Sequence, residues 1–318
     1  MRPTRYLPPL LAALLAAPTA LAQVAWNISF DASAGVLTVP ERAQVTSHIQ
    51  EAGRRWAAAM GVTAARSIEI EVRVANVPTA NGSSVTSTFV GVINGRNTFE
   101  QGVASELRTG NDPNAGEPDG FVTFGLAYLR DELWFDPDPV ARIAPVPADR
   151  TDAMSVALHE IGHIIGYNGW ADLQTGVPPP TFWSTFDRWM QPGAPTLFTG
   201  PRAVRRWGSA PDLTTGNNKH WGNPVAGLPA PTRQPLPQVQ WRNGRPAPQP
   251  GCRMLSLSAP PSGSALDRLR LEGASLINEL MNGVVFFRGS RYDITPLDRA
   301  TLDDLDLILD RLLRSGFG

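Results

Sequence analysis

The sequence is poor in several residue types that mark common classes of protein. Its 318 residues include one cysteine, Cys252, and one lysine, Lys219. A single cysteine excludes an internal disulfide, so the fold must be stabilised by core packing, by a bound metal or by both. Cys252 lies far downstream in a loop, where we expect an incidental thiol.

Charge of one sign and long apolar runs are also missing. The formal net charge is -1, and no segment concentrates acidic or basic residues. This balance gives no reason to expect a nucleic acid or an anionic membrane as partner. No segment beyond residue 22 offers the roughly 18 uninterrupted apolar residues that a membrane span needs. We therefore expect no nucleic-acid partner and no stable membrane insertion.

The amino terminus has the pattern of an export signal. Arg2 and Arg5 precede the apolar residues 7–17, and Ala20-Leu21-Ala22 provides small residues for cleavage. The apolar stretch is too short to span a bilayer and is broken by Pro18, which argues against an uncleaved anchor. We predict a signal peptide over residues 1–22, cleaved after Ala22, and a secreted or periplasmic protein.

The periodicity of apolar residues predicts an α+β fold. A helix is expected to begin near Pro40 and to end at Gly61, and alternation over residues 68–74 predicts a half-buried strand. Further strands are expected at 88–93 and 121–124, with a loop at 110–120. Thr151 or Asp152 can cap a helix that runs to Ile165, and Gly166 is expected to end it in a left-handed conformation.

Periodicity weakens beyond residue 168. Residues 224–261 contain ten prolines and predict an irregular excursion. Regular structure is expected again at 274–281, in a strand at 284–288, and in a last helix over 295–313. We therefore predict one domain over residues 23–318, with an amino-terminal subdomain to residue 166, a carboxy-terminal subdomain from residue 167, and a proline-rich excursion over 223–262.

The predicted helix over 152–165 carries the sequence His159-Glu160-Ile161-Gly162-His163. Histidines four residues apart lie on one side of a helix, so both imidazoles can reach one metal ion. A zinc ion with three protein ligands keeps a fourth position for water. Glu160, beside the first ligand, can take a proton from that water and pass it to a leaving amine.

The third ligand must come from elsewhere in the chain. The remaining histidines are His48, expected to be half-exposed on the first helix, and His220, expected in a loop. Because loops present ligands to fixed helices, His220 is the favoured candidate. Another class of zinc peptidase uses a glutamate from a later helix, for which Glu272 and Glu279 are the candidates.

The stretch from His159 to Tyr167 resembles the HExxHxxG motif of the metzincin peptidases. The compact form of that motif places a histidine three residues after the glycine, where this chain has Gly169. The leishmanolysin-like branch instead places its third histidine after an insertion, followed by a turn that contains a methionine. His220 and the later sequence Glu279-Leu280-Met281 resemble that arrangement, and the missing cysteine framework resembles bacterial members.

The resemblance implies several further roles. Met281 would form an apolar floor beneath the zinc ion, and an edge strand above the active-site helix would bind extended peptide. We expect that strand at Phe121-Val122-Thr123-Phe124. Tyr167 or Tyr292 could stabilise an oxyanion, although packing suits both better. The acidic loop with Asp112, Asn114 and Asp119 matches no calcium-loop spacing, so a solvated turn is expected there.

These observations predict a monomeric zinc endopeptidase that acts on protein or peptide substrates, with ligands His159, His163 and His220 and with Glu160 as general base. Two alternatives remain open. One is a catalytically inactive, protease-like module that binds at a surface. The other is a zinc hydrolase with a glutamate as third ligand.

Overall fold

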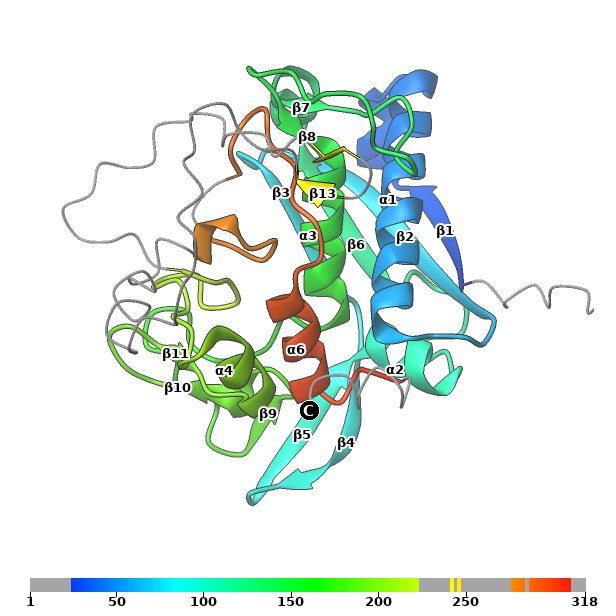
Figure 1. Cartoon of the computed structure of the whole chain (residues 1–318). Coiled ribbons are helices and arrows are strands. Elements are labelled where there is room, and N and C mark those ends of the chain that lie inside the picture. Colours follow the sequence, from blue (N-terminus) through cyan, green and yellow to red (C-terminus); the bar gives the residue numbers. More distant parts are fainter. Residues whose placement is uncertain (1–23, 223–240, 243–244, 247–275, 284–285, 310–318) are drawn as a thin grey trace, which may run out of the picture.

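The computed structural model describes residues 24–222, 241–242, 245–246, 276–283 and 286–309 (Figure 1). Its α-helices are α1 (Val39–Met60), α2 (Gly102–Thr109), α3 (Ala153–Ile165), α4 (Pro201–Trp207) and α6 (Pro296–Asp304). Shorter helical turns lie at Ala32–Val36, Tyr128–Glu132, Asp187–Trp189 and Leu276–Asn278. The strands are β1 (Val24–Phe30), β2 (Arg66–Ala75), β3 (Ala80–Ser84), β4 (Ser87–Ile93), β5 (Arg96–Gln101), β6 (Gly120–Gly125), β7 (Leu133–Trp134), β8 (Thr151–Asp152), β9 (Phe182–Ser184), β10 (Met190–Gln191), β11 (Leu197–Phe198), β12 (Trp241–Arg242) and β13 (Arg245–Pro246). This mixture agrees with the predicted α+β class.

The main sheet has four strands in the order β1-β2-β6-β3, of which only β3 runs antiparallel to its neighbour. The predicted strand over 68–74 is confirmed as β2, where Ile68, Ile70 and Val72 are fully buried. The strand predicted at 121–124 is also present, as β6. However, β6 pairs with β2 on one side and with β3 on the other, so the prediction that it is an edge strand is wrong. The edge is β3.

Helices α1 and α3 lie side by side against this sheet (Figure 1). The indole N–H of Trp56 on α1 donates to the carbonyl oxygen of Leu158 on α3 over 2.7 Å. Both residues are fully buried, so this bond ties the two helices together in the core. Helix α1 ends at Gly61, which has φ 73°, as the sequence predicts.

His48 on α1 is 1% exposed, so the expectation of a half-exposed histidine is wrong. The loop after β7 covers it. The ring of Phe135 meets the imidazole edge-on at 5.0 Å, and the backbone N–H of Asp136 donates to His48 Nε2 over 3.1 Å. His48 Nδ1 lies 2.8 Å from the carbonyl oxygen of Gln44. Both ring nitrogens are thus used within the core, and His48 belongs to neither group of potential metal ligands among the described residues.

Helix α3 ends before Gly166, as predicted, but not by a left-handed residue. Gly166 has φ -163° and ψ -24°, which lies outside the left-handed region. A Cβ there would lie 2.9 Å from Cδ1 of Leu305, so a larger residue would require that side chain to shift.

The carboxy-terminal segment has less regular structure than predicted. The described part of 274–281 contains only the turn Leu276–Asn278, and residues 286–288 form no strand. Helix α6 begins after its cap Thr295, as expected, but ends at Asp304. The chain turns at Asp306, which has φ 62°, and the N–H of Leu309 bonds to the carbonyl of Met60. That return to α1 explains the early end of the helix.

Several predictions lie outside the described residues. They concern the signal peptide over 1–22, Cys252, Glu272, residues 310–313 of the last helix and nearly all of the excursion over 223–262. Within the described ranges, no helix combines the length and the apolar character needed to cross a membrane.

Candidate metal centre

The candidate centre is built on α3, whose local sequence favours a helix at this place. The carboxylate of Asp152 caps the first turn by accepting the backbone N–H of Ser155 over 3.0 Å. Every residue of α3 is buried, because the helix has the sheet on one side and the segment from residue 167 onward on the other. The two motif histidines are therefore held on a rigid element inside the molecule.

Three histidines converge on one point. Nε2 of His163 lies 3.1 Å from Nε2 of His159 and 2.9 Å from Nε2 of His220. The Nε2 atoms of His159 and His220 are 3.0 Å apart. A zinc ion with tetrahedral nitrogen ligands at 2.0–2.1 Å separates those nitrogens by about 3.3 Å. The triangle thus needs only a slight expansion to hold a metal ion, and these residues form a group able to do so.

The other ring nitrogen of each histidine determines its tautomer. Nδ1 of His159 lies 2.8 Å from the carbonyl oxygen of Leu280, and Nδ1 of His163 lies 2.7 Å from that of Tyr167. Nδ1 of His220 lies 3.1 Å from the carbonyl oxygen of Asn217. Because a carbonyl only accepts, each Nδ1 must carry the proton. All three Nε2 atoms therefore present lone pairs to the same point, as metal ligation requires.

The electrostatics favour the neutral imidazoles that bind metals. Burial lowers the pKa of His159 to about 3 and that of His163 to about 4. Burial, followed by the charges of the other two histidines, lowers the pKa of His220 well below its usual value. All three rings are consequently neutral at neutral pH.

Glu160 lies beside this triangle and faces the same cavity. The side chain is buried, and burial raises its pKa to about 8, although the N–H of Gly82 on β3 donates to the carboxylate and opposes the shift. Strand β3 approaches α3 very closely here, because a Cβ on Gly82 would lie 2.2 Å from the carbonyl oxygen of Glu160. A carboxyl group with a raised pKa in a cavity is typical of a general acid or base.

His220 is held by two neighbouring loops. Its own carbonyl accepts the N–H of Thr214, and the N–H of Trp221 donates to the carbonyl of Met281 over 2.8 Å. On its other side, the ammonium group of Lys219 lies 2.5 Å from the carboxylate of Asp187, and both groups are buried. Asp187 also accepts the backbone N–H of Trp170, so one carboxylate fixes two loops near the centre.

Met281 lies directly beneath the histidine-bearing helix. A Cβ on Gly162, between the two motif histidines, would lie 2.6 Å from its sulfur atom. The side chain is fully buried. Met281 therefore packs against the turn of α3 that carries His159 and His163.

The centre opens into a cavity of about 390 Å³. It is lined by Thr79, Ala80, Asn81, Gly82, Tyr128, Val156, His159, Glu160, His163, Asn168, Asn217, Lys219, His220, Asn282, Gly283 and Phe286. Edge strand β3 forms one wall. The sequence did not predict that Tyr128 and Lys219 line the cavity. Lys219 could have been found, because it is the only lysine and directly precedes His220.

Three other predicted candidates, Tyr167, Tyr292 and Glu279, lie away from the cavity or outside the histidine group. The hydroxyl of Tyr167 is buried and bonds to Asp298, and that of Tyr292 accepts the N–H of Phe287. Neither tyrosine lines the cavity, which agrees with packing roles. Glu279 is not part of the histidine group, and Glu272 lies outside the described residues.

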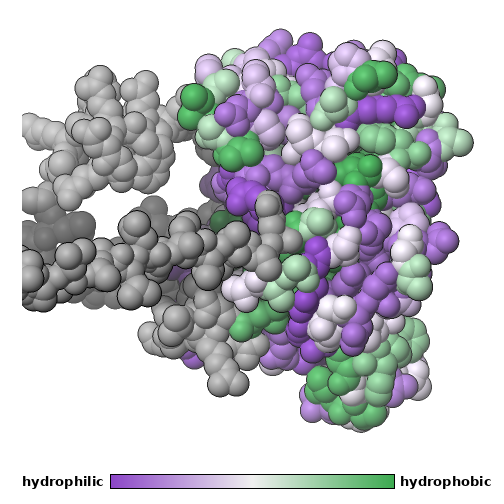
Figure 2. All heavy atoms as spheres, turned by 90° about the vertical axis from the view of Figure 1, so that its right-hand side faces the viewer, coloured by the Kyte–Doolittle hydropathy of each residue, from purple (hydrophilic) through white to green (hydrophobic). Residues whose placement is uncertain are grey.

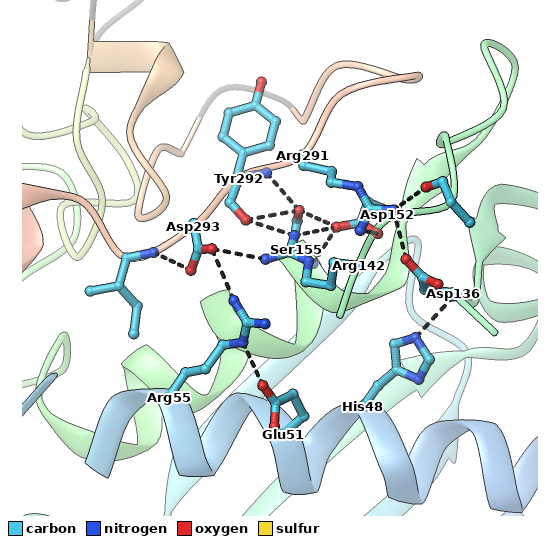
Figure 3. Close-up of polar contacts among 12 residues, drawn as sticks. His48, Glu51, Arg55, Asp136, Arg142, Asp152, Ser155, Arg291, Tyr292 and Asp293 are labelled. Atoms are coloured by element: carbon cyan, nitrogen blue, oxygen red, sulfur yellow. Dashed lines mark hydrogen bonds and ion pairs between the residues drawn. The ribbon is translucent and has the colours of Figure 1, made fainter. Parts of the chain in front are cut away.

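A buried polar network holds the segment after Met281 against the start of α3 (Figure 3). Arg142 donates to the carboxylate of Asp152 over 2.8 Å and to the carbonyl of Tyr292 over 3.1 Å. The N–H of Tyr292 in turn donates to the hydroxyl of Ser155 over 2.7 Å. Because Phe286 precedes this anchor and lines the cavity, the network also positions the cavity wall beside His159.

Comparison with known proteins gave no relatives: no family model, no curated protein and no solved structure matches this chain.

Proposed function

We propose that this protein is a zinc-dependent endopeptidase. The observation that carries the proposal is the convergence of three unprotonated Nε2 atoms beside a buried glutamate in one open cavity. Three neutral imidazoles suit zinc, and a three-ligand set leaves a coordination position free, as hydrolytic rather than structural zinc sites do. A purely structural site would have no use for Glu160.

Zinc bound by His159, His163 and His220 would supply a Lewis acid that acidifies water and polarises a carbonyl group. Glu160 then takes a proton from the attacking water and delivers it to the leaving amine. Tyr128 and Lys219 line the same cavity and are the candidate donors toward the developing oxyanion.

The substrate class follows from the edge strand. In the described part of the chain, β3 pairs with β6 alone, so its other side can add an extended peptide to the sheet. This wall of the cavity suits a polypeptide better than a small hydrolysable molecule. We infer further that the chain is of the leishmanolysin-like metzincin type, with Met281 as the floor of the site, and that it is exported and acts as a monomer.

The test combines zinc content with casein cleavage by the purified protein. Wild type should bind one zinc per chain and cleave casein. Glu160→Gln should keep the zinc and lose at least about 100-fold in cleavage, because general base catalysis contributes about that much. His220→Ala should lose zinc and activity together.

Glu279→Gln is the matched control, because it removes the alternative glutamate ligand and should leave zinc content and cleavage unchanged. If His220→Ala keeps its zinc while Glu279→Gln loses it, the glutamate-ligand alternative is correct. If wild type binds zinc but no form cleaves casein, the binding-module alternative is favoured.

A further inference from the structure

A second group of potential metal ligands is separate from the three histidines. It consists of Glu106 on α2, Asp112 in the following loop, and Asp119 immediately before β6. One carboxylate oxygen from each of the three lies within 4.8 Å of the others. The sequence predicts a solvated turn here. That prediction is wrong for Asp119, which is only 1% exposed.

Two of these carboxylates have unsatisfied oxygen atoms in the interior. Glu106 is 4% exposed, and its Oε2 has no hydrogen-bond partner. Oδ1 of Asp119 also has no hydrogen-bond partner. The other oxygen of Asp119 accepts the N–H of Glu69 over 2.7 Å, which fixes the carboxylate. Among the described residues, no lysine or arginine forms an ion pair with Glu106, Asp112 or Asp119.

Ionised carboxylates only accept hydrogen bonds, so they cannot satisfy one another. Buried polar oxygens without a partner are costly, and buried charges are normally paired or bound to a metal. Asp112 is satisfied, because its carboxylate accepts the backbone N–H groups of Asn114, Ala115 and Gly116. The unsatisfied oxygens of Glu106 and Asp119 must therefore either share a proton or face a cation. Burial and the neighbouring acids Asp119 and Asp112 raise the pKa of Glu106 to about 8, which shows how strongly the site disfavours bare negative charge.

The geometry and the donor set match a hard divalent cation. Calcium binds oxygen ligands at 2.3–2.6 Å, so two ligands of one ion lie at most about 5 Å apart. The 4.8 Å limit on this group falls within that span. Asp112 is exposed, so water can complete the six to eight ligands that calcium takes.

We propose that Glu106, Asp112 and Asp119 form a calcium site that joins α2, the loop over 110–119 and the start of β6. The ion would replace the missing positive charge and tie three segments together. The residue after Asp119 packs against the helix of the histidine centre. Gly120, next to Asp119, is so close to α3 that a Cβ there would lie 2.9 Å from Cγ2 of Ile164.

The test is calorimetric titration of calcium chloride into full-length protein that has been treated with a chelator and dialysed at pH 7.5. Wild type should bind one calcium with a Kd below about 1 mM, and its melting temperature should rise with calcium concentration. Magnesium chloride should bind at least about 10-fold more weakly, because magnesium demands a stricter octahedral geometry. Glu106→Gln and Asp119→Asn should each weaken calcium binding at least 10-fold.

Two controls keep the result specific. Glu117→Gln removes an exposed carboxylate of the same loop outside the group, and should bind calcium like wild type. His159→Ala disrupts the histidine centre and should also bind calcium normally. Without calcium, Glu106→Gln should melt at a higher temperature than wild type, because the substitution removes repulsion between the carboxylates of the group. A cooperative melting transition of this variant would also show that it folds.

Two outcomes overturn the proposal. The first is a wild type that gives neither binding heat nor a change in melting temperature at 10-fold above the expected Kd, which would mean that the carboxyl groups share protons instead. The second is calcium binding that survives in both Glu106→Gln and Asp119→Asn, which would place the ion elsewhere.

Discussion

Lys219 is the residue that most directly couples the irregular segment to the histidine centre. It precedes His220, lines the cavity, and forms a buried ion pair with Asp187 at 2.5 Å. Burial lowers the pKa of its ammonium group, while Asp187 opposes that shift. A charge in such a position is stable only while its partner is present.

We expect Lys219→Met to destabilise the protein by about 3 kcal/mol, because it leaves the Asp187 carboxylate buried without its cation. The double variant Lys219→Met, Asp187→Asn should recover at least about half of that loss, because no charge is then left unpaired. Urea unfolding followed by tryptophan fluorescence measures both. Equal losses in the single and double variants would contradict the pairing argument.

At the residue scale, the sequence predicted which histidines lie together better than it predicted their surroundings. His159, Glu160 and His163 follow from a five-residue spacing on one helix, which is local information. His220 followed by elimination among four histidines. The ion pair of Lys219 with Asp187 could not be predicted, because it depends on how two loops without periodicity fold back on each other.

At the scale of elements, the close packing of edge strand β3 against α3 depends on Gly82. A Cβ on Gly82 would lie 2.2 Å from the backbone of α3, so Gly82→Ala must push the strand away from the helix. The hydrogen bond from its N–H to the Glu160 carboxylate would then be lost. We expect a loss of about 1–3 kcal/mol in stability and at least a 10-fold fall in casein cleavage. Ser83→Ala, in the same strand, is the control and should change neither by much.

The start of α3 is a second element whose stability can be tested (Figure 3). The side chains of Arg142 and Asp152 are 6% and 0% exposed, whereas Asp293 in the same network is 56% exposed. Arg142→Met should therefore cost about 3 kcal/mol, while Asp293→Asn should cost less than about 1 kcal/mol. Thermal or urea unfolding of the two variants gives the comparison, and similar costs would refute it.

Elements with strong periodicity were predictable, and those made by tertiary contacts were not. Helix α1 and strand β2 follow from apolar residues at helical and alternating spacing. Strand β3 has the sequence Ala80-Asn81-Gly82-Ser83-Ser84, which shows no alternation; it is a strand because β6 offers it backbone partners. The last helix ended early because the chain turns at Asp306 to reach α1, a contact that periodicity does not encode.

For the whole molecule, buried carboxyl groups predict how stability depends on pH once metals are removed. The pKa of Glu106 is about 8 in the folded protein, against 4.5 for an ordinary glutamate. The unfolded chain then binds fewer protons between these values, so stability falls as the pH rises through this window. The pKa of buried His48 is lowered, so its protonation destabilises the fold only in acid. His48 therefore does not obscure the pH dependence of stability above pH 6.5.

Chelator-treated wild type should therefore melt at a lower temperature at pH 8 than at pH 6.5. The decline should be smaller in Glu106→Gln, which cannot ionise at that position, and unchanged in Glu117→Gln. Differential scanning fluorimetry across this range measures the slopes. A slope in Glu106→Gln equal to that of wild type would show that Glu106 does not titrate in this window.

One exposed surface is visible at the scale of the whole molecule. The hairpin of β4 and β5 projects from the body, and its apolar residues form a green patch in Figure 2. Phe89 and Val92 are 53% and 63% exposed there. Nothing in the described chain covers them.

The burial of the only lysine also determines how this protein responds to amine chemistry. Reagents that acylate amines would find no lysine on the native surface, so apart from the terminal amine the folded chain should remain unlabelled. Acylation of Lys219 would require the loop beside His220 to open. Its rate, measured by mass spectrometry of a single peptide, would report how often that loop leaves the centre, and bound metal should slow it.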